Sequence, residues 1–549
     1  MMVFLYLSTN IFFMLTKSDK SQLRGIIFRH LDGIATATSA FSLHKKQILE
    51  YILEKGSINL KSLSDIFDAN EGYLNVALRV LCSQGWLEQD LSNKDNTVTY
   101  ATNEKSKEAF QLVYLYEDAV NLLRYSDRFA TEKMISTDAF IALERIFKKF
   151  ENNFGLDISD ETSIEYQIYK HIEGTIAGPI IVLLGVNGLF HKYFMEASFT
   201  AEEYHKDPES FKKILDFFSH LGWFKKKRDT YQFTDKGLFF AKRASAYGVT
   251  VSYLPTFLQL DELIFGNPLV LKTDSPNDTE KHVHREMNVW GSGGAHATYF
   301  KVIDKVIIDL FNRPIDLQPK GILDMGCGNG AFIEHIFNII EQQTLRGKML
   351  DDHPLFLVGA DFNKAALKVT RANLIAADIW AKVIWGDIGR PDLLASDLKE
   401  DYNIDLKDLL NVRTFLDHNR IWEAPNNKYD FISTSTGAYA SAGNRLNNND
   451  VEASLLEHLS KWKPYVDKFG LLIIELHTID PSLTAKNIGK TAATAYDATH
   501  GYSDQYIVEV DVFRNIAEKA GLAPDDMHFA KFPDSELATV SINLLKGKD

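Results

Sequence analysis

One short segment constrains the fold more than any other part of the chain. GILDMGCGNGAFIEHIF (residues 321–337) begins with apolar residues typical of a buried strand, continues through the turn DMGCGNG, and ends with apolar residues at helical spacing. Glycine is needed at such a turn because the backbone bends sharply and a ligand must approach it closely. The segment therefore predicts a Rossmann-like α/β domain with a cofactor bound at the turn.

Strand and helix patterns alternate after this turn, which predicts a mostly parallel sheet. LFLVGADFNKAAL predicts a second strand that ends in Asp361, and AKVIWGDIGRPDLL a third that ends in Asp387. YDFISTSTGAYA predicts a fourth strand with Thr434 at its mouth, and KWKPYVDKFGLLIIELHTID predicts a helix and a fifth strand. Ligands bind at the carboxyl ends of parallel strands, so these residues are expected to share one site.

The turn D-x-G-C-G-x-G resembles the first motif of class I S-adenosylmethionine-dependent methyltransferases more than the dinucleotide fingerprint G-x-G-x-x-G. This resemblance implies a seven-stranded methyltransferase domain over residues 281–549, with S-adenosyl-L-methionine as cofactor. It also implies that Asp361 binds the ribose hydroxyls and that Asp387 lies beside the adenine amino group. NVWGSGGAH (288–296) resembles a cofactor lid in which Trp290 or His296 covers the methionine end. The predicted cofactor-binding residues are Asp324, Gly326, Cys327, Gly328, Gly330, Asp361, Phe362, Asp387, Ile388 and Thr434.

Three histidines follow the predicted strands. FLDHNR contains His418, ELHTID contains His477, and THGYSDQY contains His500 and Gln505. FLDHNR, THGYSDQY and NVWGSGGAH together resemble the metal-dependent C-methyltransferase domains of polyketide assembly lines, of the type that starts apratoxin biosynthesis. The resemblance implies one iron beside the cofactor and methylation of the carbon of a malonyl unit on an acyl carrier protein.

Such chemistry suits these residue types. A carbon flanked by carbonyls must lose a proton before it attacks a methyl group, and a metal chelated by the two carbonyl oxygens stabilises the enolate. Imidazole combined with carboxylate or amide oxygen suits iron or manganese. The predicted ligands are His418, His500 and Gln505, with Asp417 as a fourth ligand or an outer partner. His477 and His418 are the predicted catalytic residues, and His477 is the candidate general base because imidazole titrates near neutral pH.

The region before the methyltransferase domain repeats one helical pattern. We predict a first winged-helix-like unit with a helical connector over residues 40–160 and a second unit over 161–280. LCSQGWLEQD aligns with FSHLGWFKKK, which indicates an internal duplication. The apolar third helix of each unit predicts a homodimer. Residues 1–39 are predicted to be an N-terminal extension, whose apolar start is short for a membrane span and suggests a packing helix or an upstream start codon rather than a targeting element.

Charge and cysteine usage limit the partners and the compartment. The net charge of -14 argues against nucleic-acid binding through phosphate neutralisation, although residues 225–228 form a basic spot in the second unit. Only two cysteines occur, which favours a cytoplasmic protein without disulfides. Two alternatives stay open: a metal-free small-molecule O-methyltransferase with His477 as base, and a winged-helix DNA-binding regulator whose methyltransferase-like domain senses a small molecule.

Overall fold

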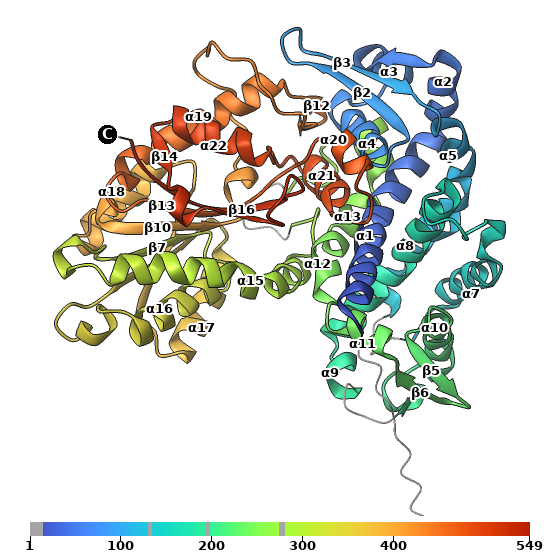
Figure 1. The fold of residues 1–549 in the computed structure, drawn as a ribbon, viewed down its shortest axis with the longest axis horizontal. Helices are drawn as coiled ribbons and strands as arrows, with labels where there is room; N and C mark the ends of the chain where they lie inside the picture. The colour runs from blue at the N-terminus through green and yellow to red at the C-terminus, as the bar shows by residue number, and fades with distance from the viewer. Residues whose placement is uncertain (1–14, 130–133, 194–197, 274–279, 549) are drawn as a thin grey trace, which may run out of the picture.

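The structure, a computed structural model, describes residues 15–129, 134–193, 198–273 and 280–548. A mostly helical N-terminal region, coloured blue to green in Figure 1, lies beside an α/β domain coloured yellow to red. This arrangement confirms the predicted fold class, a Rossmann-like domain preceded by two winged-helix-like repeats. The apolar start of the chain, residues 1–14, lies outside the described residues. No helix in the described ranges is long and apolar enough to cross a membrane.

The two winged-helix-like units share one order of elements and one sheet topology. Strand β3 lies between β1 and β2 in the first sheet, and β6 lies between β4 and β5 in the second. The first unit consists of α2 (Ile48–Lys55), β1 (Ser57–Asn59), α3 (Leu60–Phe67), α4 (Glu71–Ser83), β2 (Leu87–Ser92) and β3 (Thr97–Thr102). The second consists of α9 (Leu189–Tyr193), β4 (Phe199–Thr200), the 3-10 helix η4 (Ala201–Glu203) in the place of α3, α10 (Pro208–His220), β5 (Phe224–Lys227) and β6 (Thr230–Phe233).

The turn after the third helix is the same in both units. Gly85 and Gly222 adopt φ values of 75° and 77°. The next amide, that of Trp86 or Trp223, donates to the carbonyl five residues earlier, at 2.9 Å and 2.8 Å respectively. Both indole rings are buried. The two units are therefore repeats in three dimensions as well as in sequence.

The duplication extends to the long helix in front of each unit. Helices α1 (Lys17–Lys45) and α8 (Ile164–Val186) carry the related sequences HLDG (30–33) and HIEG (171–174). A Cβ atom at Gly33 would lie 2.4 Å from the Cα of His171, and one at Gly174 would lie 2.3 Å from the Cα of His30. The helices thus cross at a reciprocal contact that only glycine permits.

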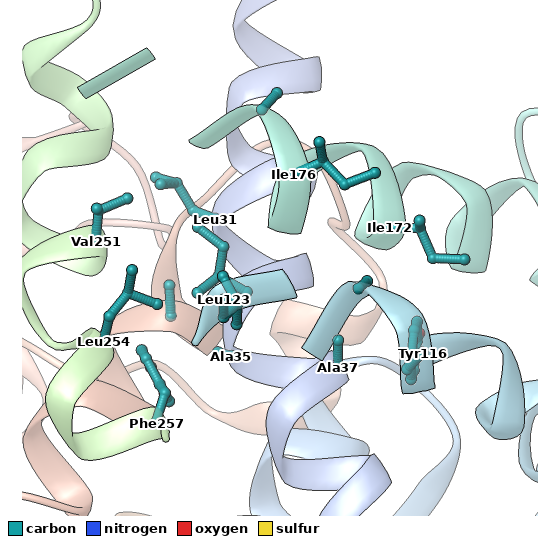
Figure 2. Packing of buried hydrophobic residues seen from close by; sticks show 14 of the residues in the cluster. Leu31, Ala35, Ala37, Tyr116, Leu123, Ile172, Ile176, Val251, Leu254 and Phe257 are labelled. Atoms are coloured by element: carbon teal, nitrogen blue, oxygen red, sulfur yellow. The ribbon is translucent and has the colours of Figure 1, made fainter. Parts of the chain in front are cut away.

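Residues 17–39, predicted to belong to an extension, form most of α1 instead. The helix passes residue 39 without a break, and all residues from Leu31 to Ala40 are buried. Figure 2 shows Leu31, Ala35 and Ala37 of α1 within the core, close to side chains of other helices. A helix buried on all sides has no amphipathic stripe, so the periodicity that identifies surface helices is absent here.

The remaining helices of the N-terminal region connect and cover the two units. They are α5 (Ser106–Leu112), α6 (Glu117–Leu123), α7 (Thr137–Glu151), α11 (Asp235–Ala241), α12 (Ser245–Ser252), α13 (Leu254–Phe257) and α14 (Leu260–Phe265).

The α/β domain has a central sheet in the order β14-β16-β13-β10-β7-β8-β9. Neighbouring strands from β13 to β9 are parallel, and β16 is antiparallel to β13. Seven strands were predicted; an eighth arises because β14 and β15 both pair with β16, at its end and at its start. The strands are β7 (Gly321–Met325), β8 (Phe356–Asp361), β9 (Ala381–Trp385), β10 (Leu409–Thr414), β13 (Leu471–Leu476), β14 (Leu522–Pro524), β15 (Ala530–Phe532) and β16 (Val540–Gly547).

Helices cover both faces of this sheet. Helices α15, α16 and α17 share one hydrophobic core with the sheet, and α18, α19 and α22 share the other. The helices of this domain are α15 (Arg285–Phe311), α16 (Ala331–Gln343), α17 (Lys364–Ala376), α18 (Pro391–Tyr402), α19 (Asn448–Val466), α20 (Pro481–Ala485), α21 (Ala493–Gly501) and α22 (Val510–Lys519). A short hairpin, β11 (Ala440–Ser441) and β12 (Asn444–Arg445), precedes α19.

The fourth parallel strand is β10, not the predicted segment 429–440. Most residues of β10 are buried, and the strand pairs with β7 on one side and β13 on the other. Segment 429–439 forms neither helix nor strand and joins no sheet. Its hydroxyl groups bond to other side chains instead, as Ser433 does to Glu452 and Thr436 to Glu509. Exposed and buried residues alternate in this segment as they do in a strand, although the segment pairs with no strand.

The predicted lid, NVWGSGGAH, is helical and belongs to α15. A Cβ atom at Gly248 of α12 would lie 2.5 Å from the Cα of Gly291, so the two helices touch backbone to backbone. The Trp290 ring lies against Gly185 and Gly248 rather than over the glycine turn, and the His296 side chain lies outside the described part of the structure. Close packing on α12 compensates the low helix propensity of these glycines.

Candidate cofactor and acceptor site

The glycine turn after β7 is held by the end of the neighbouring strand β8. Gly326, Gly328 and Gly330 have φ values of 82°, 55° and 83°, a region that favours glycine. The amides of Gly326 and Cys327 donate to the carbonyl of Ala360 at 2.8 Å and 3.1 Å. A Cβ atom at Gly328 would meet nothing closer than a carbonyl oxygen at 4.0 Å. The turn thus leaves open space above Gly328.

Asp361 ends β8 and faces this turn. Its carboxylate accepts hydrogen bonds from the amide of Gly328 at 3.0 Å and from the amide of Asn363 at 2.8 Å. Burial raises the pKa of the Asp361 carboxyl, while these two hydrogen bonds and the positive charge of Arg285 act in the opposite direction. The neighbouring Phe362 ring is 38% exposed and lies 5.6 Å from the Trp385 ring, at the open end of the strands.

Thr370, which the sequence did not single out, supports the turn from α17. Its hydroxyl donates to the carbonyl of Gly328 at 2.7 Å, and the Cys327 sulfur lies 3.5 Å from the same hydroxyl. The Cys327 side chain therefore points toward Thr370. A threonine in mid-helix carries no sequence signal for this role, because only the packing of α17 brings it to the turn.

Asp324, in β7, is an unpartnered buried carboxyl group. It is 1% exposed, and its Oδ1 atom has no hydrogen-bond partner among the described residues. Burial, together with the negative charge of Asp361, raises the pKa of Asp324 to about 8. An acceptor atom of this kind needs a partner, and a cationic ligand group is one that would suit it.

Asp387 and Ile388 follow β9. Asp387 accepts a hydrogen bond from the amide of Gly389 at 2.8 Å, and the carbonyl of Ile388 accepts one from the Trp462 indole at 2.7 Å. Asp387 borders a cavity of about 80 Å³ whose lining also includes Arg420 and His458. Both predicted residues thus lie at a carboxyl end of the sheet.

Thr434 does not lie at a strand end. Because segment 429–439 is outside the sheet, Thr434 is exposed and its neighbours Ser433 and Ser435 contact the first winged-helix unit. The Asn93 side chain donates to their carbonyl oxygens at 2.8 Å and 3.0 Å. The predicted strand on which its assignment as a cofactor-binding residue rested is therefore wrong, and the assignment itself stays a prediction.

The chain after β10 passes directly over the glycine turn and carries His418. A Cβ atom at Gly326 would lie 3.0 Å from the Leu416 side chain, two residues before His418. The Nδ1 atom of His418 lies 2.5 Å from Oε1 of Glu475, and the His418 amide donates to Oε2 at 3.2 Å. Sequence reasoning missed Glu475, which lies in the same strand segment as His477.

The His500 ring lies beside the His418 ring, and Tyr506, the residue after Gln505, donates its amide hydrogen to the His418 carbonyl at 2.8 Å. His500 belongs to the last turn of α21 rather than to a loop, and its ring centroid is 5.0 Å from that of His418. Its Nδ1–H group donates to the Tyr496 carbonyl at 2.8 Å. The Gln505 amide side chain donates to the Tyr253 hydroxyl at 3.2 Å. Within the described ranges, no hydrogen-bond partner faces Nε2 of His418 or Nε2 of His500.

Asp417 turns away from this cluster. Its Oδ1 atom lies 2.5 Å from Arg413 Nη1 and 3.0 Å from His458 Nε2. Burial opposes the ionised form, yet Arg413 and His458 hold the pKa of Asp417 well below its usual range. The Oδ1 atom of Asp417 therefore belongs to a separate buried ion cluster, and the role of Asp417 as a metal ligand stays a prediction. The described residues contain no group of three or more His, Cys, Asp and Glu side chains that could hold a metal ion.

His477 cannot act as the general base. The side chain is 0% exposed, its Nδ1–H group donates to the Val508 carbonyl at 2.9 Å, and Nε2 accepts from the Ser541 hydroxyl at 2.7 Å. Burial lowers the pKa of His477 to about 4. Both ring nitrogens are engaged and neither faces the glycine turn, so the prediction is wrong. β16 pairs with the end of β13, and the His477 amide donates to the Thr539 carbonyl just before β16.

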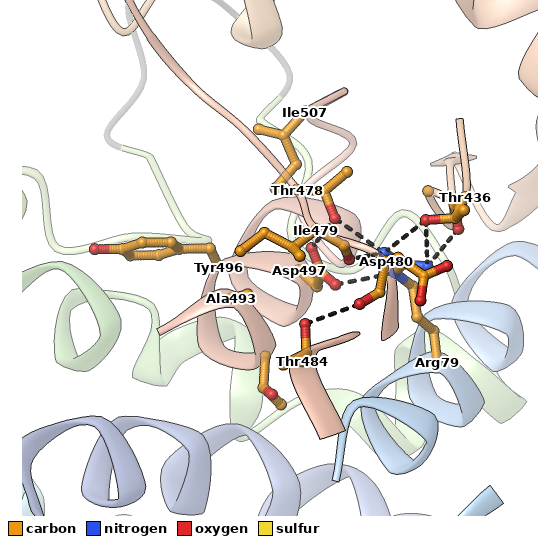
Figure 3. Close-up of polar contacts among 12 residues, drawn as sticks. Arg79, Thr436, Thr478, Ile479, Asp480, Thr484, Ala493, Tyr496, Asp497 and Ile507 are labelled. Atoms are coloured by element: carbon orange, nitrogen blue, oxygen red, sulfur yellow. Dashed lines mark hydrogen bonds and ion pairs between the residues drawn. The ribbon is translucent and has the colours of Figure 1, made fainter. Parts of the chain in front are cut away.

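Helix α4 of the first winged-helix unit helps to hold the cluster in place. Figure 3 shows Arg79 of α4 reaching Asp497, Thr478 and Ile479 of the α/β domain. Asp497 lies one turn before His500 in α21. Burial raises the pKa of Asp497, and the charge of Arg79 opposes this shift. The N-terminal region is thus part of the scaffold of the site.

The burial of α4 bears on two further predictions. Every residue from Gly72 to Ser83 is buried, so this helix presents no face to a DNA groove.

The third helix of the second unit, α10, is covered by α7, with the rings of Phe147 and Phe217 stacked at 4.5 Å. The apolar faces on which the predicted homodimer rested are therefore occupied within one chain, and the homodimer stays a prediction.

Comparison with known proteins extends these observations. Residues 280–543 match the family described as AprA MT2-like domain, residues 173–267 match the AprA winged helix domain, and residues 23–89 match the AprA N-terminal domain. No curated protein matches the chain.

Several solved structures resemble the chain. The mitomycin 7-O-methyltransferase MmcR is 11% identical, with 75% of this chain and 100% of that chain covered and a TM-score of 0.40. The CurJ carbon methyltransferase is 10% identical, with 74% and 99% covered and a TM-score of 0.32. LepI, solved in complex with SAM, is 13% identical, with 80% and 99% covered and a TM-score of 0.37.

The sheet order, the glycine turn and the matched domains define a class I S-adenosylmethionine-dependent methyltransferase. Within this class, the chain carries an AprA MT2-like methyltransferase domain behind an AprA winged helix domain and an AprA N-terminal domain.

Proposed function

We propose that this methyltransferase transfers the methyl group of S-adenosyl-L-methionine to a carbon nucleophile, the enolate of a malonyl or β-keto acyl unit, with one iron or manganese ion bound. The observation that carries the proposal is the meeting of His418, His500 and Gln505 next to the glycine turn. The two imidazole rings lie 5.0 Å apart, and the Gln505 backbone amide donates to the His500 carbonyl at 3.0 Å.

The residues around the turn fit the cofactor. The open space above Gly328 would admit a ligand close to the backbone, and the Asp361 carboxylate beside it would accept hydrogen bonds from ribose hydroxyls. The unpartnered oxygen of Asp324 suits the ammonium group at the methionine end. Asp387, beside a small cavity, suits the adenine amino group.

The donor set fits iron or manganese. His418 and His500 each have one ring nitrogen held by a neighbour, Glu475 or the Tyr496 carbonyl, which leaves Nε2 of each ring to bind a metal. This is how metal-binding histidines are usually oriented. The Gln505 amide oxygen would complete the set, and the remaining coordination positions would take the acceptor. Such an ion supplies Lewis acidity that stabilises the enolate.

A second candidate function, metal-free O-methylation, requires a different base from the one predicted. His418 takes that role in place of His477, because its Nε2 atom is unpartnered among the described residues and lies near the turn. In this candidate, Nε2 removes the proton from a hydroxyl acceptor before methyl transfer. In either case the acceptor is a small molecule or a unit bound to an acyl carrier protein, in the cytoplasm.

The proposal is tested with protein purified without an affinity tag or chelator. Elemental analysis should find about one iron or manganese per chain, and methyl transfer to an acetoacetyl or malonyl thioester of N-acetylcysteamine should require that metal. His500→Ala should lower metal content and transfer by at least about 10-fold. S-adenosylhomocysteine binding should persist, because the glycine turn is a separate element.

The control is His191→Ala, an exposed histidine of α9 far from the turn in the sequence. It should keep metal content and rate unchanged. Full transfer to the thioesters by metal-free protein would reject the metal. Metal-independent transfer to phenols that is lost in His418→Gln would instead establish the second candidate.

A further inference from the structure

An apolar groove lies at the end of the sheet opposite to the glycine turn. It is formed where β8 and β9 begin and where α17 ends, and its volume is about 420 Å³. The apolar part of its lining includes Leu355, Ile375, Ile379 and Trp380. Because β9 is the edge strand of the sheet, no described strand covers the groove from that side.

Two large hydrophobic side chains beside this groove are exposed. Trp380 is 89% exposed, the highest value among the large hydrophobic side chains that the structure describes, and Ile375 is 76% exposed. Single exposed hydrophobic residues are common on protein surfaces, but a contiguous apolar patch marks a surface that binds a partner. Tryptophan is also among the residues that most often anchor a protein interface. The groove therefore has the properties of a binding surface.

The charges in the lining of the groove are arranged symmetrically about Trp380. Asp378 and Lys382 both line the groove and stand two residues before and two residues after the tryptophan. The Lys382 ammonium lies 4.9 Å from the centroid of the Tyr402 ring, but within the described ranges neither Asp378 nor Lys382 takes part in an ion pair. Opposite charges on either side of one exposed anchor make the surface complementary to a second copy of itself.

We propose that this groove is the interface of a homodimer with two-fold symmetry. In this dimer the Trp380 ring of each copy packs into the groove of the other. A two-fold axis beside Trp380 brings Asp378 of one copy to Lys382 of the partner subunit and, by symmetry, forms the same ion pair a second time. The interface thus consists of an apolar centre with a charged rim, as specific interfaces usually do.

The proposed interface is separate from the cofactor site. Strand β8 runs from Phe356 beside the groove to Asp361 beside the glycine turn, which is about 16 Å at about 3.3 Å per residue. Both sites of the dimer therefore stay open. The dimer goes beyond the proposed function and does not depend on what the protein methylates.

Sedimentation velocity of the full-length protein tests the apolar centre. The wild type should sediment as a dimer at micromolar concentrations. Trp380→Ala should raise the dissociation constant by at least about 30-fold, because two-fold symmetry removes the anchor from both copies at once. The matched control is Met527→Ala. Met527 is 86% exposed but lies between β14 and β15, at the other edge of the sheet, so its loss should leave the dimer unchanged.

A pair of charge reversals tests the two-fold arrangement. Asp378→Lys places two positive charges at each of the two contacts, and Lys382→Asp places two negative charges there, so each variant alone should be mostly monomeric. An equimolar mixture of the two variants should form heterodimers, since both contacts then join opposite charges. A head-to-tail arrangement does not give this result, because only one contact is formed between two copies.

The side chains substituted at the interface are exposed, so each variant should keep the melting temperature and the S-adenosylhomocysteine affinity of the wild type. A wild type that is monomeric throughout the micromolar range would overturn the proposal. A dimer that persists in Trp380→Ala, or a mixture of the charge variants that does not associate, would overturn it as well. A dimer that behaves as expected but methylates neither thioesters nor phenols would refute only the proposed function.

Discussion

The guanidinium group of Arg79 donates to the carboxylate of Asp497 at 2.9 Å, and the two side chains are only 2% and 4% exposed. Arg79 belongs to the first winged-helix unit, whereas Asp497 belongs to the helix that carries His500. This buried ion pair joins the N-terminal region to the acceptor site. Removing one side chain leaves the charge of the other buried away from water without an opposite charge beside it.

We therefore expect Arg79→Ala to lower the free energy of unfolding by about 3–5 kcal/mol. Urea denaturation followed by tryptophan fluorescence would measure the loss. Asp497→Asn should also destabilise, but Arg79→Ala combined with Asp497→Asn should cost less than the sum of the two single variants, since neither charge is left alone. Strict additivity would show that the pair does not couple the two regions.

Gly328→Val should weaken cofactor binding while the fold is kept. The branched side chain would fill the open space above the turn, and φ at 55° adds a strain of about 1–2 kcal/mol for a residue with a Cβ atom. Calorimetry with S-adenosylhomocysteine should show at least about a 10-fold loss of affinity, which corresponds to about 1.4 kcal/mol. Gly188→Val is the matched control, because Gly188 has φ 80° and a Cβ atom added there would meet no other atom within 4 Å, but the residue lies in the second winged-helix unit. Equal losses in both variants would contradict a specific effect.

Asp32→Asn should stabilise the protein at alkaline pH. Burial raises the pKa of this carboxyl to about 8, and its Oδ1 atom is without a hydrogen-bond partner in the described structure. In the unfolded chain the carboxyl titrates near pH 4, as is usual for aspartate, so the folded state holds an extra proton between about pH 4 and 8. The wild type must therefore lose stability as the pH rises through this window, whereas the asparagine variant does not.

Thermal unfolding at pH 5 and pH 8.5 would test this prediction. The advantage of Asp32→Asn should grow with pH to about 1–3 kcal/mol, the cost of a buried polar group without a partner. Asp229→Asn, at the exposed tip of the β5–β6 wing, should show no such trend. An advantage that shrinks with pH would mean that Asp32 is ionised and paired in the folded state.

His477→Gln should affect stability rather than catalysis. The imidazole is neutral and bonded at both nitrogens, so its loss should cost about 1–3 kcal/mol through the groups left unpaired. Because burial lowers the pKa of His477 to about 4, its contribution to stability is present above about pH 6.5 and is lost as the pH falls toward 4. The folded variant should keep most of its methyl transfer, in contrast to His418→Gln. A large loss of rate at unchanged melting temperature would restore His477 as a base.

The local parts of the fold were accessible from the sequence. The glycine turn, the strand before it and the helix after it depend on backbone conformations that a few neighbouring residues specify, and the turn has the predicted form. The turns at Gly85–Trp86 and Gly222–Trp223 in the two winged-helix units depend on equally local geometry. His418, His500 and Gln505 could be placed near each other because they follow strands of one parallel sheet.

Short-range sterics and hydrophobic periodicity thus specify most of the elements from the chain alone, together with the class of chemistry at the ends of the strands. The choice of the fourth strand depends on pairing in three dimensions. Residues 409–414 and segment 429–440 both have the sequence pattern of a strand, but only β10 pairs with β7 and β13. Folding also places Asp417 and His477 in hydrogen bonds inside the protein, while Glu475 holds His418. The direction of a side chain at a strand end depends on partners from distant parts of the chain, and a single sequence carries no local signal for such contacts.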